Sequence, residues 1–66
     1  MNEIAIEAVQ NEIGGIEDNL FRARLQKRAK PSWVSGNGET IDEVISQYET
    51  RLKKYKAALQ QLKEEV

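Results

Sequence analysis

Residues 40–66 read TIDEVISQYETRLKKYKAALQQLKEEV, and large apolar side chains recur along them at alternating intervals of four and three residues. They are Ile41, Ile45, Tyr48, Leu52, Tyr55, Leu59, Leu62 and Val66. Such steps average about 3.5 residues, so these side chains form one seam on a helix that coils around another helix. The segment opens on a capping box, in which the Thr40 hydroxyl and the Glu43 carboxylate satisfy free backbone amides reciprocally. We expect an amphipathic helix over about residues 40–65, with both tyrosine rings in its core rather than acting as cofactor ligands.

A second seam with the same period lies in the N-terminal half of the chain. It consists of Ile6, Val9, Ile13, Ile16, Leu20 and Ala23. This seam predicts a first helix over about residues 2–30. Glu3 and Glu7 lie in its early turns, where the helix dipole favours negative charge, and Asn2 is a candidate cap.

Gly14 and Gly15 interrupt the first helix. A glycine in a helix interior costs roughly 1 kcal/mol relative to alanine, so some other interaction must compensate. One interpretation is a kink or a break that divides the segment into two helices. The other is the close approach of a second backbone, as at a tight crossing between subunits. Both interpretations agree with the sequence.

A loop of about residues 31–39 joins the two helices. Pro31 disfavours helical geometry at Lys30, and the run Gly36, Asn37, Gly38 supplies positive φ angles for a turn. The same run lacks the lysine and the glycine spacing of a phosphate-binding loop. We therefore interpret it as a connection and not as a nucleotide site.

The charges of both helices change from acidic to basic along the chain. In the first helix, acidic residues precede Arg22, Arg24, Lys27, Arg28 and Lys30, and in the second they precede Arg51, Lys53, Lys54 and Lys56. Antiparallel packing places opposite charges side by side, whereas parallel packing in register aligns like charges. Together with the short loop, this layout predicts an antiparallel helical hairpin.

The fold class expected from these features is all-α, with residues 1–66 forming one domain. A chain of 66 residues without cysteine has neither disulfides nor a thiolate metal site to reinforce its small core, so we expect self-association. The simplest closed assembly is a homodimer that forms a four-helix bundle, and a higher oligomer is the alternative. In size and layout the chain resembles the plasmid RNA-regulating Rop proteins. This likeness concerns architecture and implies no function.

Several classes of function are disfavoured by composition. No apolar run is long enough to span a bilayer, and the N-terminal residues are not basic as in a secretory signal, so we expect a cytoplasmic protein without a membrane partner. Histidine and cysteine are absent, which argues against an enzyme with a small-molecule substrate. Carboxylate pairs such as Glu3 and Glu7 lack the Glu-x-x-His partner of metal-binding bundles, so we expect no metal and no other cofactor.

A second apolar patch lies around the first helix from its seam. It consists of Phe21, Leu25 and Ala29. Because a two-helix contact cannot cover it as well, we expect the loop to fold over it, with a partner chain as the alternative. Trp33 either anchors the loop to this patch and to Val44, which we prefer, or marks a contact site. The candidate partner-binding residues are Phe21, Leu25, Trp33 and Val34.

The basic segment beside Trp33 is the feature that most favours contact with nucleic acid. Its side chains spread around most of the helix at about 100° per residue, and the acidic start of the second helix offers them partners. The net charge of −1 argues against a general polyanion binder. We therefore expect a non-enzymatic protein-interaction or regulatory module, such as an accessory factor of a phage or mobile element. An RNA- or DNA-binding dimer and a structural scaffold are the alternatives.

Overall fold

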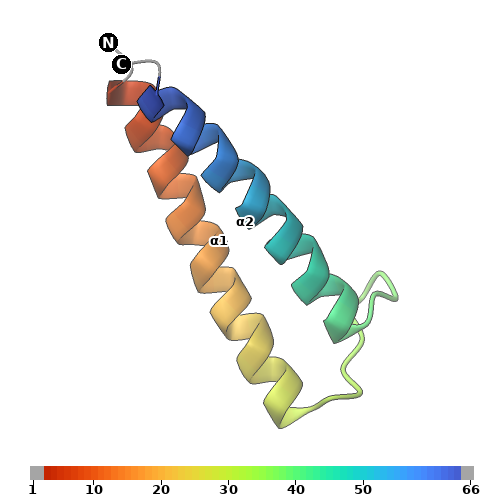
Figure 1. Cartoon of the computed structure of the whole chain (residues 1–66). Coiled ribbons are helices and arrows are strands. Elements are labelled where there is room, and N and C mark those ends of the chain that lie inside the picture. The colour runs from red at the N-terminus through yellow and green to blue at the C-terminus, as the bar shows by residue number, and fades with distance from the viewer. Residues whose placement is uncertain (1–2, 65–66) are drawn as a thin grey trace.

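Two long helices packed side by side make up the protein (Figure 1). The computed structural model describes residues 3–64, in which α1 spans Glu3–Ala29 and α2 spans Ile41–Glu64. The helices run in opposite directions, so the start of α1 and the end of α2 lie at the same end of a rod of 45 × 17 × 14 Å. The predicted all-α antiparallel hairpin is confirmed. The candidate cap Asn2 and the seam residue Val66 lie outside the described residues.

Gly14 and Gly15 do not interrupt α1, which is one continuous helix from end to end. Of the two interpretations of this pair, the kink or break is therefore wrong, and Figure 1 shows α1 without a sharp bend. Ile13 and Ile16, on either side of the glycines, are buried, so tertiary packing keeps this turn helical in spite of its poor propensity. A methyl group added at either glycine would have no neighbour within 4 Å, so no part of the same chain approaches closely.

The ends of both helices follow from local chemistry. α1 ends immediately before Lys30, because Pro31 disfavours helical geometry there; the Lys30 amide still donates to the Gln26 carbonyl at 2.8 Å. At the start of α2 the Glu43 amide donates to Thr40 Oγ1 at 3.2 Å. This bond is one half of the predicted capping box and satisfies an amide that has no partner within the helix.

The loop between the helices is a hydrogen-bonded turn. The Ser35 amide donates to the Glu39 carbonyl at 2.8 Å, and the Gly38 amide donates to the Ser35 carbonyl at 3.0 Å. Ser35 Oγ also accepts hydrogen bonds from the amides of Asn37 at 3.2 Å and of Glu39 at 3.1 Å. Of the three residues expected to supply positive φ angles, Gly38 does so, with φ of 85°, and no other residue within 3–64 has a positive φ.

Replacing Gly38 with alanine is expected to lower the free energy of unfolding by about 1–2 kcal/mol, because a side chain is strained at this φ. Gly36 offers a matched control in the same turn, since its φ is not positive and an added methyl group meets nothing within 4 Å. Gly36→Ala should be neutral or stabilise by up to about 1 kcal/mol. Chemical denaturation at one protein concentration measures both variants, and equal losses would contradict the role of Gly38.

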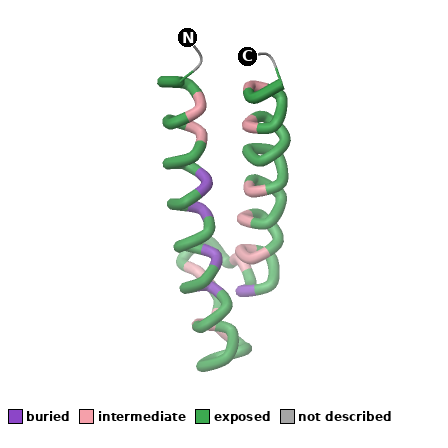
Figure 2. The backbone as a smooth tube through the Cα atoms, turned by 60° about the vertical axis from the view of Figure 1, so that its left-hand side comes forward, coloured by how far each residue is buried: buried purple, intermediate pink, exposed green. Residues whose placement is uncertain are grey.

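The core is a thin layer between the two helices (Figure 2). Its buried residues are Ile13, Ile16, Leu20, Ala23 and Ile41. Most other seam residues are half-buried, namely Ile6, Val9, Ile45, Tyr48, Leu52, Leu59 and Leu62. Tyr55 is 36% exposed, so the contact between two helices does not by itself give it the core position expected in a bundle. Two helices cover only one face of each other, and a seam residue at the edge of their contact keeps a side open to solvent.

Candidate interaction surfaces

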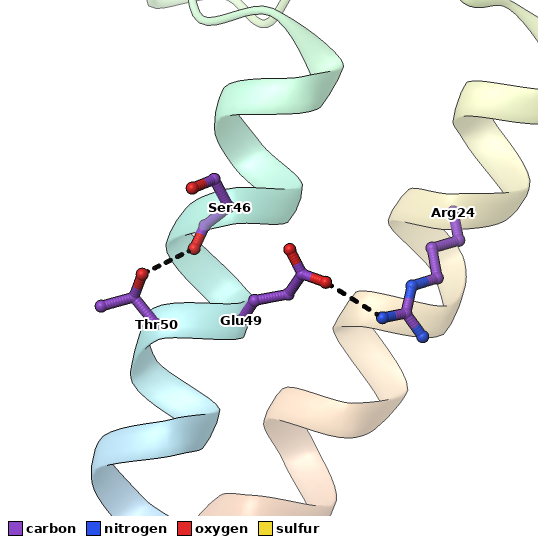
Figure 3. Close-up of polar contacts among 4 residues, drawn as sticks. All are labelled: Arg24, Ser46, Glu49 and Thr50. Carbon is purple, nitrogen blue, oxygen red and sulfur yellow. Dashed lines mark hydrogen bonds and ion pairs between the residues drawn. The ribbon is translucent and has the colours of Figure 1, made fainter.

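One flank of the hairpin is closed by ion pairs that join α1 to α2, and we call it the charged flank. The pairs are Glu17 with Lys56 at 3.9 Å, Arg24 with Glu49 at 3.3 Å and Lys27 with Asp42 at 2.6 Å. Figure 3 shows the second of them. From one pair to the next, the residue number in α1 rises while that of its partner in α2 falls, which confirms the predicted antiparallel charge complementarity. These side chains are half or more exposed, so each pair contributes under about 1 kcal/mol and mainly selects the arrangement.

The residues of the opposite flank can be identified from the heptad spacing, because residues seven apart lie on the same side of a coiled helix. One such row on α2 consists of Asp42, Glu49 and Lys56, and another consists of Val44, Arg51 and Ala58. Each residue of the first row comes immediately after a seam residue, as Glu49 comes after Tyr48. Each residue of the second row comes immediately before a seam residue, as Arg51 comes before Leu52. The second row therefore lies on the other side of the seam, which we call the open flank.

Two hollows lie along the open flank. The larger, of about 410 Å³, is lined by Glu12, Ile16, Arg51, Lys54, Tyr55 and Ala58. The smaller, of about 280 Å³, is lined by Asn19, Arg22, Ala23, Gln26, Trp33, Ile41, Val44 and Tyr48. On α1 the flank is again a row with a spacing of seven: Glu12, Asn19 and Gln26. Buried residues such as Ile16, Ala23 and Ile41 form part of the walls, so the hollows reach the edge of the core.

Trp33, Arg22 and the seam residues that line the hollows are among the candidate site residues predicted from the sequence, whereas the members of the two heptad rows that define the open flank are not. A signal for them is nevertheless present, because their heptad row contains neutral residues such as Asn19, Gln26 and Ala58 where a solvent-facing row usually carries charge. The seam residues alone do not reveal it. The difference in residue type between the rows of the two flanks can be interpreted only when the hairpin shows which row of α1 faces which row of α2.

The outer face of α1 carries an apolar patch, formed by Phe21 and Leu25. Their exposed fractions are 57% and 46%, and Ala29 one turn further is exposed as well. The expectation that the loop covers this patch is therefore wrong. The loop instead turns towards the start of α2, where it is held by backbone hydrogen bonds, and it leaves the outer face of α1 uncovered.

Trp33 is half-buried and lies at the junction of the loop with the helices. It lines the smaller hollow together with Ala23 and Val44, and its carbonyl accepts a hydrogen bond from the Ile41 amide at 3.2 Å. Val44 is thus the predicted neighbour that shares this hollow, whereas the Phe21 and Leu25 patch lies elsewhere. The next residue, Val34, is 54% exposed.

The basic segment is divided among several intramolecular partners. Arg24 and Lys27 belong to the charged flank, and Arg22 pairs with the aspartate one turn earlier at 3.1 Å. Within residues 3–64, Arg28 and Lys30 have no carboxylate at ion-pair distance. A nucleic-acid binder gains affinity when its unpaired lysines and arginines neutralise phosphates and displace the counterions of the nucleic acid. Because three of these cations already pair within the chain, the segment is weakened as a nucleic-acid surface.

Neither helix of the described chain contains an apolar stretch that could cross a bilayer, and residues 3–64 hold no group of three potential metal ligands. No protein-family model, curated protein or solved structure matches this chain.

Proposed function

We propose that this chain is a non-catalytic protein-interaction module that works as a homodimer, with two hairpins forming a four-helix bundle. The observation that carries the proposal is the large share of apolar side chains that the hairpin leaves uncovered. Ile4, Phe21, Leu25, Val34 and Tyr55 are exposed, against a core of five buried residues. Exposed apolar patches mark association sites, and a chain of this size seldom builds a sufficient core alone.

The Phe21 and Leu25 patch is the surface we assign to a partner protein. The two side chains are four residues apart on one helix face, which is the spacing of anchors by which an amphipathic helix enters an apolar groove. Arg22 lies between them in the sequence, and Arg28 follows Leu25 by three positions. The partner that fits is a protein with an apolar groove and an acidic rim, since rim charges of opposite sign steer association.

The double variant Phe21→Glu, Leu25→Glu is expected to lose the partner while it keeps the hairpin, because the new carboxylates cannot enter an apolar groove. Ser46→Glu, Thr50→Glu is the matched control. These two residues are also exposed and four apart, and Figure 3 shows them on the side of α2 away from α1. In-cell cross-linking followed by purification should recover the same protein with the wild type and the control, and not with the Phe21, Leu25 variant.

Circular dichroism of both double variants checks that helicity is retained. Equal recovery with all three proteins would contradict the assignment to Phe21 and Leu25. Light scattering of the wild type tests self-association independently, with a dimer as the expected result. Concentration-dependent oligomers larger than a tetramer would instead indicate a scaffold.

A further inference from the structure

We propose that the open flank is the surface on which the second copy of this chain docks, with α1 of one copy against α2 of the other. This inference rests on the proposed self-association and names its site. The occupant follows from three properties of the flank: its lack of ion pairs between the two helices within residues 3–64, its hollows beside the core and the distribution of its charges.

The two flanks differ in how their charges are paired. All ion pairs that join α1 to α2 within residues 3–64 lie on the charged flank, whose side chains remain half or more exposed. The open flank carries neutral residues such as Asn19, Gln26 and Val44, and its charged residues form no ion pair between the helices within the described part of the chain. The centre of a protein interface is depleted in charged residues, and its rim is polar. The smaller hollow, with one charged residue among its eight, has the composition of an interface centre, and the charged flank has that of a surface facing water.

The edge of the core lies along the open flank. The hollows of about 410 and 280 Å³ reach Ile16, Ala23 and Ile41, which belong to the buried layer. Both hollows are open grooves at the edge of the core, and a layer of side chains packed into them would extend the dense packing of the interior. Because both hollows lie on the same flank and succeed each other along the hairpin, one further layer of two helices covers them together. A second hairpin supplies that layer and covers its own hollows in the same contact.

The charges on the flank select the orientation of the second copy. Arg51 and Lys54 line the larger hollow from α2, and Glu12 lines it from α1. A two-fold axis perpendicular to the helices would pack α2 of one copy on α2 of the other. Arg51 and Lys54 lie on either side of the midpoint of α2, so these two cations of one copy would meet the same two cations of the other copy. An axis parallel to the helices packs α1 on α2 and places Glu12 of each copy beside the cations of the other. Like charges in an interface are costly, so we infer the second arrangement.

The test compares two neighbouring alanines of α2, both exposed. Ala58 lines the larger hollow, whereas Ala57 is on the outer face of the helix. Ala58→Glu and Ala57→Glu make the same change in charge, size and helix propensity. Sedimentation equilibrium of the full chain should give a dissociation constant for Ala58→Glu at least about a hundredfold above that of the wild type, and no more than a few-fold change for Ala57→Glu.

The outcomes separate this inference from the proposed function. A dimeric wild type with equal effects of the two substitutions overturns the open flank as the interface and leaves self-association in place. A monomeric wild type overturns both. Circular dichroism at high concentration shows whether Ala58→Glu still folds.

Cysteine cross-linking tests the same surface without a charge change, because the chain has no cysteine of its own. Glu12 and Ala58 line the same hollow from different helices. A mixture of the single variants Glu12→Cys and Ala58→Cys, treated with a short bis-maleimide, should give a mixed dimer as the main product. Dimers formed equally well by each variant alone would overturn the α1-on-α2 orientation.

Discussion

Replacing Leu20 with alanine is expected to lower the free energy of unfolding by about 2–5 kcal/mol, the range for a buried leucine reduced to alanine. Leu20 is 4% exposed and lies among the four buried residues of α1, which form most of the core within residues 3–64. A domain of this size has a total stability of roughly 3–10 kcal/mol, so the variant should lose a large share of its stability. Circular dichroism with a chemical denaturation series at one protein concentration measures the effect.

The adjacent residue supplies the control for this prediction. Phe21 has a larger side chain than Leu20 but is 57% exposed, so Phe21→Ala removes little buried surface. Its effect should stay below about 1 kcal/mol, as is usual for surface substitutions. If Phe21→Ala were as destabilising as Leu20→Ala, Phe21 would belong to the core of the assembled protein and could not be the anchor for a partner.

The double substitution Gly14→Ala, Gly15→Ala is expected to raise the free energy of unfolding by about 2 kcal/mol. Both glycines lie inside α1, both are exposed, and an added methyl group at either meets nothing within 4 Å. Alanine is favoured over glycine in a helix interior by roughly 1 kcal/mol per residue. For so small a protein this gain is a large share of its stability, and a shift of the denaturation midpoint should report it directly.

The reverse substitution on α2 is the control for the glycine variant. Ala57→Gly, at an exposed position inside the second helix, should cost about 1 kcal/mol. A loss of stability in the double alanine variant would contradict the prediction. If that loss appeared only at protein concentrations at which the chain associates, it would indicate that a second backbone approaches these glycines, which is the alternative interpretation of the pair.

Much of the hairpin could be predicted from single residues because the signals are local. The threonine that caps α2 accepts the Glu43 amide as expected, and Pro31 ends α1 where its ring excludes helical geometry. The charge polarity of the two helices predicted their antiparallel order, and Arg24 with Glu49 is one of the resulting pairs. The candidate site was predicted less well, because the expected cover over Phe21 and Leu25 is absent and the open flank was not anticipated.

The sequence alone determines that this protein consists of two helices packed antiparallel, since heptad spacing, caps, a proline and charge order act over a few residues or along a whole helix. Only the tertiary structure decided that α1 continues through Gly14 and Gly15, that the loop leaves the patch of Phe21 and Leu25 uncovered and that one flank of the hairpin stays open. These features depend on how each helix is rotated about its axis and on where the loop packs. Both are set by the sum of many weak contacts between residues distant in sequence, which no local pattern contains.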